Sequence, residues 1–115
     1  MSAWDRFADR MAEAVQRGVR GDRSPRVPEG GTILWGAFWS LCATRTMALG
    51  APNPITFGEM EAWRRLTGTP LQPHHVAVLG RIDRAWLAAL ASKAEGKLKV
   101  STLKLTPAAF DNTLG

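Results

Sequence analysis

The sequence predicts an all-α protein: a small helical bundle, an N-terminal helix on a proline- and glycine-rich linker, and an extended C-terminal tail. Apolar residues recur at helical spacing in four segments of the chain, and capping or turn residues separate these segments. The chain has 115 residues, of which 45% are hydrophobic. A chain of this length has room for one core and not for two independent ones.

The first predicted helix occupies residues 1–20. Ser2 followed by Asp5 is a variant of the capping box that opens a helix. Residues 21–31 contain two prolines and three glycines, so they predict a linker and a separable N-terminal helix. The apolar residues of this helix have the spacing of a helix that lies in a groove, either of its own protein or of a partner: Trp4, Phe7, Met11 and Val15.

Residues 32–96 are predicted to form the helical core domain, with helices near 33–49, 56–66 and 73–94. Thr32 is suited to cap the first of these helices, which Gly50 should end.

The later helix boundaries rest on equally local signals. Thr56 and Glu59 form a capping box, and Pro73 fits the first position of a helix. Gly96 is expected to end the last helix. The C-terminal tail, 97–115, predicts a short strand or an extended segment, with one helical turn after Thr106.

The residue inventory excludes several functional classes. Cys42 is the only cysteine, so no internal disulfide can form, and no spacing resembles a zinc site. No run of about 18 apolar residues is present, which argues against a membrane span. His74 and His75 are the only imidazoles, and no nucleophile, phosphate loop or carboxylate pair accompanies them. We therefore expect an intracellular protein that is not an enzyme and has no cofactor.

The charge balance leaves a nucleic-acid partner open but does not favour it. The chain carries 15 basic and 10 acidic residues, and its pI is near 10.4. The stretch from Arg17 to Arg26 is locally dense in arginine, which suits either a binding patch or a solvated segment. The joint 67–72 is longer than the three or four residues usual in a helix-turn-helix. The helix after it also lacks Arg, Asn and Gln at its start.

Aromatic residues are the most informative feature of the chain. The first half of segment 33–49 is apolar nearly all round, and five tryptophans are many for so small a fold. Asp83 lies on an otherwise apolar stripe and needs a partner if buried, for which Arg45 or an indole N–H is a candidate. We expect Arg45 and Asp83 to orient the helices. The residues predicted to form the core and a partner-binding groove are Trp35, Phe38, Trp39, Trp63 and Trp86.

An ordered series of these residues resembles the phage tail assembly chaperones, small proteins of the tail-gene clusters of tailed bacteriophages and prophages. The resemblance covers about residues 28–91. Where relatives often carry a Trp-Glu pair after the proline, this chain has His74 and His75. The residues that carry the resemblance are Leu34, Trp35, Phe38, Trp39, Leu41, Arg45, Ile55, Thr56, Glu59, Trp63, Leu66, Thr67, Gly68, Leu71, Pro73, Leu79, Asp83 and Trp86.

The resemblance implies a binding role in the cytoplasm of a host bacterium. Such chaperones coat the apolar, helical tape-measure protein until tail-tube subunits polymerise around it. The expected partner is therefore the tape-measure protein, with contact to the tail-tube protein and self-association left open. Two alternatives remain at this point: a small basic nucleic-acid-binding regulator, and a structural tail component of the virion.

Overall fold

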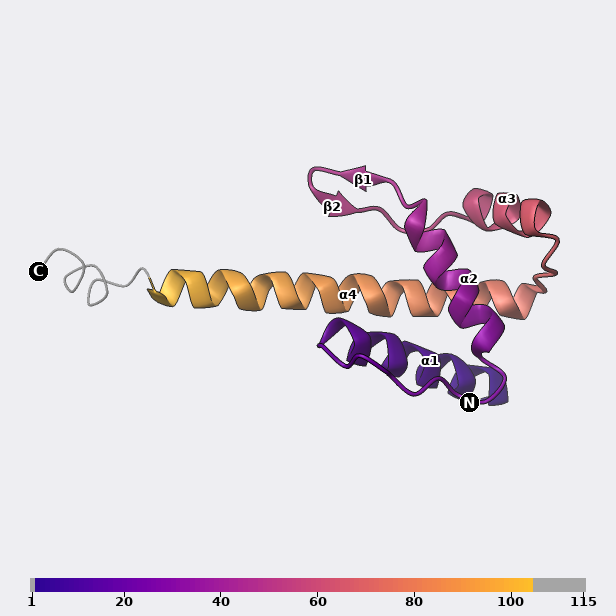
Figure 1. Ribbon diagram of the computed structural model, residues 1–115, viewed down its shortest axis with the longest axis horizontal. Helices are drawn as coiled ribbons and strands as arrows, with labels where there is room; N and C mark the ends of the chain where they lie inside the picture. The colour runs from indigo at the N-terminus through magenta and orange to yellow at the C-terminus, as the bar shows by residue number, and fades with distance from the viewer. Residues whose placement is uncertain (1, 105–115) are drawn as a thin grey trace, which may run out of the picture.

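Four helices and one short hairpin form the part of the chain that the structure describes (Figure 1). The computed structural model describes residues 2–104, and the side chains of residues 2–97. The all-α prediction is confirmed. The elements, in chain order, are α1 (Ala3–Val19), α2 (Thr32–Ala43), β1 (Met47–Ala48), β2 (Ala51–Pro52), α3 (Phe57–Thr67) and α4 (Pro73–Lys104).

Helix α1 lies alongside the first half of α4 and runs in the same direction (Figure 1). Contacts near both ends fix this alignment: Trp4 stacks on His74, with ring centroids 4.2 Å apart, and Lys93 Nζ donates to Val19 O at 3.2 Å. The predicted groove helix therefore packs on its own protein. Its apolar stripe enters the same buried cluster as those of α2, α3 and α4, which includes Met11, Val15, Leu34, Phe38, Leu41, Met60, Val78, Leu79 and Ile82.

The capping boxes predicted for α1 and α3 are both present. Ser2 Oγ accepts the Asp5 N–H at 3.1 Å, and Asp5 Oδ2 accepts the Ser2 N–H at 3.0 Å. Thr56 and Glu59 exchange the same two bonds at the start of α3. These boundaries are predictable because a capping box involves only residues three apart.

Helix α2 is shorter than predicted. Its N-cap is Gly31 rather than Thr32, and no side chain makes a cap bond there. The helix ends at Ala43, where Thr44 Oγ1 donates back to Leu41 O at 3.0 Å. Residues near 46–53, which the sequence suggested were partly helical, form a β-hairpin instead.

The hairpin turns through Leu49 and Gly50, with φ of 55° and 78°. Two positive φ angles in a two-residue loop define a type I′ turn, whose hand matches the twist of the paired strands. Leucine is unusual in the left-handed region, so the turn carried no recognisable sequence signal. The Leu49 side chain is fully exposed at the tip.

Helix α4 continues through Gly96, which was predicted to end it, to Lys104. Gly96 does not have a positive φ, so it does not form a left-handed helix cap. An interior glycine costs a helix only about 1 kcal/mol relative to alanine, and helix-forming residues flank this one. Residues 97–104 are thus helical rather than extended, and the turn expected after Thr106 lies outside the described residues.

Candidate partner-binding surface

A buried ion pair joins the end of α2 to the middle of α4. Arg45 Nη2 lies 2.6 Å from Asp83 Oδ1, and the two side chains are only 3% and 5% exposed. The other carboxylate oxygen, Asp83 Oδ2, accepts the backbone N–H of Ile55 at 2.9 Å. Asp83 therefore fixes both the end of α2 and the segment that leads into α3.

Further bonds hold the Arg45 guanidinium in place. It donates from Nη1 to Asn53 O at 2.8 Å and from Nη2 to Cys42 Sγ at 3.0 Å. Burial lowers the pKa of Arg45, but hydrogen bonds to Asp83 and Cys42 raise it more, so its pKa lies above the ordinary value. Burial raises the pKa of the Cys42 thiol, which favours its protonated form.

Edge-to-face ring contacts connect this ion pair to the surface of α2. The Arg45 guanidinium lies over the Trp86 ring, 4.3 Å from its centroid, and Trp86 meets Phe38 at 6.1 Å. Phe38 meets Trp39 at 5.0 Å, and Trp39 meets Trp35 at 5.6 Å. We call these five side chains the aromatic ladder. It runs from a buried charge at one end to the two α2 tryptophans at the other, of which Trp39 is the more exposed.

Exposure differs sharply among the aromatic residues singled out from the sequence. Phe38 is fully buried, so its ring belongs to the core and cannot contact a partner. Trp39 is 39% exposed, while Trp35, Trp63 and Trp86 are half-buried. Trp63, on α3, packs against the core but makes no ring contact with the ladder among the described residues.

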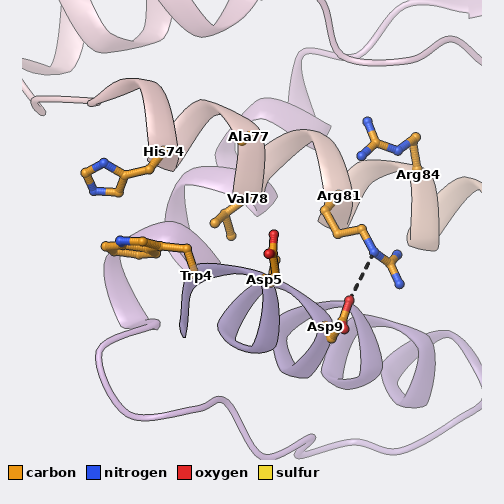
Figure 2. Close-up of a pocket in the computed structure, with 9 residues that line it drawn as sticks. Trp4, Asp5, Asp9, His74, Ala77, Val78, Arg81 and Arg84 are labelled. Atoms are coloured by element: carbon orange, nitrogen blue, oxygen red, sulfur yellow. Dashed lines mark ion pairs between the residues drawn. The ribbon is translucent and has the colours of Figure 1, made fainter. Parts of the chain in front are cut away.

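A second feature, which the sequence did not single out, is an open hollow of about 620 Å³ between α1 and α4 (Figure 2). Trp4 and His74 face each other at one end. Asp9 and Arg81 form an ion pair at 3.5 Å further along. Asp5 also lines the hollow, but it serves the helix cap, and the hydrogen bonds from the Ser2 backbone and hydroxyl hold its pKa below the usual value.

The histidine pair has a structural use at the start of α4. His75 Nδ1 accepts the backbone N–H of Gln72 at 3.0 Å, which is the bond that a carboxylate makes in a capping box. Burial, and secondarily the neighbouring His74, lower the pKa of His75. The imidazole thus favours the neutral form that this bond requires.

A metal-binding cluster and a membrane-spanning helix are both absent from the described residues. Within residues 2–104, no group of three or more His, Cys, Asp or Glu side chains is placed to hold a metal ion. None of the described helices combines the length and apolar character needed to cross a bilayer. The arrangement consists instead of a helical scaffold that presents aromatic side chains.

The described residues form a small helical scaffold that carries partly exposed aromatic side chains. The family model described as phage tail assembly chaperone matches residues 5–88, and the chain belongs to that family. No curated protein and no solved structure matches it. The matched range corrects the extent of the resemblance, which began near residue 28: α1 lies inside the family's shared region, in keeping with its packing on α4.

Proposed function

We propose that this protein is a non-catalytic chaperone that binds the tape-measure protein in the host cytoplasm and shields its apolar helical stripes until tail-tube subunits replace it. Family membership supports the assembly role. The observation that supports protein binding is the exposed end of the aromatic ladder, Trp39 with Trp35 beside it. Apolar stripes on an unsheathed partner would otherwise associate with one another.

The ladder suits a contact that must form readily and later be displaced. Ring contacts on two sides already orient Trp39, so little side-chain entropy is lost on binding. Trp39 is 39% exposed, which for a tryptophan of about 250 Å² leaves roughly 100 Å² to bury, worth about 2.5 kcal/mol. One such anchor adds specificity without making the complex permanent.

A pull-down with tiled fragments of the tape-measure protein from the same gene cluster tests the proposal, followed by calorimetry on the fragment captured. Wild type should bind, and Trp39→Ala should weaken binding by up to about sixtyfold while the circular dichroism spectrum stays unchanged. Phe57→Ala is the matched control, because Phe57 is an aromatic residue of α3 that is 77% exposed and outside the ladder. No binding by wild type, or equal binding by a folded Trp39→Ala, contradicts the proposal.

Two further measurements separate the alternative functions. A chaperone that is displaced during assembly should be absent from purified phage particles, whereas a structural tail component should be present in them. Binding to duplex DNA should be weak, whereas a nucleic-acid-binding regulator should show low-micromolar affinity that falls steeply with salt.

A further inference from the structure

Three hollows follow one another along a face of α1 that differs from the one in Figure 2, and neighbouring hollows share lining residues. The first is apolar, has a volume of about 210 Å³, and is lined in part by Phe7, Ile33 and Leu71. The second shares Phe7 with the first and reaches Arg10. The third shares Arg10 with the second, has a volume of about 570 Å³, and extends to the end of α1. We call the three together the α1 groove.

The two ends of the α1 groove differ in chemistry. Its first part is lined mainly by aromatic and aliphatic side chains, contributed by α1, α2 and the segment before α4. Its last part lies between α1 and the linker and is lined by Arg10, Arg17 and Arg26, with Glu13 and Glu29 among them. The groove is therefore apolar at one end and predominantly basic at the other.

The arginines of the basic end are available to a partner. The ion pairs found among the described residues involve Arg45, Arg64, Arg65 and Arg81. Arg10, Arg17 and Arg26, all exposed, take part in none of them. Three guanidinium groups thus stand against two carboxylates in one hollow, and an acidic segment is the complementary occupant.

We propose that the α1 groove binds an acidic amphipathic helix of the protein partner, with one large apolar side chain in the hollow at Phe7. The inference rests on the proposed function, since the partner is the chaperone's client. Arg10 and Arg17 follow Phe7 by about 5 and 15 Å along the helix axis. Acidic side chains about one and three turns from the apolar anchor of a partner helix therefore match them.

The composition of the groove favours a peptide over a nucleic acid. A polyphosphate backbone carries uniform, closely spaced negative charge, about one per 1.7 Å of duplex axis. Such a strand would meet Glu13 and Glu29 at the basic end and find only apolar side chains at the other. A peptide can alternate apolar and acidic side chains, and so can satisfy both ends.

The test uses the full chain and a fluorescein-labelled synthetic helix of about five turns, with one Phe and with Glu one and three turns after it. Fluorescence anisotropy should show binding that weakens at higher salt. Replacing both Glu residues of the peptide by Gln should together reduce the affinity about tenfold, because exposed ion pairs contribute up to about 1 kcal/mol each. Replacing the Phe by Ala should reduce it as well.

Variants of the protein locate the binding to the groove. The double change Arg10→Glu with Arg17→Glu should weaken binding about tenfold or more. The neutral pair Arg10→Gln with Arg17→Gln should give a smaller loss, and it serves if the charge-reversed protein does not fold. Arg65→Glu is the matched control, since Arg65 is an exposed arginine of α3 that does not line the groove.

Equal affinity for the Glu and Gln peptides, wild-type affinity in both double variants, or tighter binding to duplex DNA than to the acidic peptide overturns the proposal. These results are distinguishable from failure of the proposed function. Capture of tape-measure fragments without peptide binding overturns the α1 groove alone. Peptide binding without capture overturns the tape-measure assignment.

Discussion

Removing the buried carboxylate of Asp83 should destabilise the fold more than any exposed substitution. In Asp83→Ala, the Arg45 guanidinium, only 3% exposed, loses its counter-ion and the Ile55 N–H loses its acceptor. Breaking a buried pair from one side costs about 3–5 kcal/mol, because a charge is left uncompensated in the interior. The remaining bonds to Asn53 and Cys42, and the Trp86 ring, keep Arg45 partly satisfied. We therefore expect a value near the lower limit, about 3 kcal/mol.

That loss is large for a domain of this size, whose total stability is typically about 5–15 kcal/mol. It corresponds to a fall in Tm of about 12–24 °C. Urea unfolding, followed by tryptophan fluorescence and by circular dichroism, measures it. Glu61→Ala is the control, since Glu61 pairs with Arg64 and Arg65 on the exposed side of α3 and should leave the free energy of unfolding unchanged within error.

A double-mutant cycle distinguishes the ion pair from simple packing. The cycle compares the single variants Arg45→Met and Asp83→Leu with their combination. The combination removes both charges, so it should lower the free energy of unfolding by less than Asp83→Ala alone does. A loss below about 1 kcal/mol in Asp83→Ala, or additive effects in the cycle, would refute the reasoning that an uncompensated buried charge dominates.

Three further predictions follow from individual positions. Leu49→Asn should stabilise the protein by about 1 kcal/mol in urea unfolding, because asparagine tolerates the positive φ of the hairpin turn better than leucine does. A loss of stability would contradict the inference that Leu49 is strained there. Gly31→Ala should lower the free energy of unfolding by about 1–3 kcal/mol, because the added Cβ would lie 2.6 Å from Met11 Sδ. Gly36→Ala, whose Cβ would have nothing within 4 Å, should raise it by about 0.5–1 kcal/mol. Equal effects of the two substitutions would exclude the steric clash as the cause. The lowered pKa of His75 means that the unfolded chain binds a proton at this imidazole more readily than the folded chain does. The contribution of His75 to the free energy of unfolding is therefore fully present above about pH 6.5 and is lost as the pH falls below it. His75→Gln, which keeps an acceptor for the capping bond, should flatten this fall in Tm between pH 7 and pH 5; an unchanged slope would exclude His75 as its source.

Local signals made parts of the fold predictable and left others out of reach. The starts of α1 and α3 follow from Ser2, Asp5, Thr56 and Glu59, because each capping bond joins residues three apart. The end of α2 did not follow, since the turn uses Leu49 where Asn would have announced a hairpin. The extension of α4 through Gly96 was missed because one glycine lowers helix stability only slightly.

The candidate site shows the same division. Sequence patterns identified the tryptophans and the need of Asp83 for a partner. They did not show which of the aromatic side chains would face solvent. Phe38 and Trp39 are neighbours in the chain, yet one is fully buried and the other is exposed. The side of α2 that packs against the core decides this, and α2 is apolar on nearly every side, so its own sequence does not mark that side. The α1 groove was likewise missed, since residues as far apart in the chain as Trp4 and His75 line it.

By itself, the sequence determined that the chain is helical, where two of its helices begin, and that it carries more aromatic surface than a small core needs. Only the tertiary structure decided that Arg45, and not an indole, meets Asp83, that α1 packs on α4, and which rings remain exposed. The physical reason is one of range. Caps and periodicity act within one or two helical turns, whereas burial and ion pairing depend on how segments distant in the sequence come together.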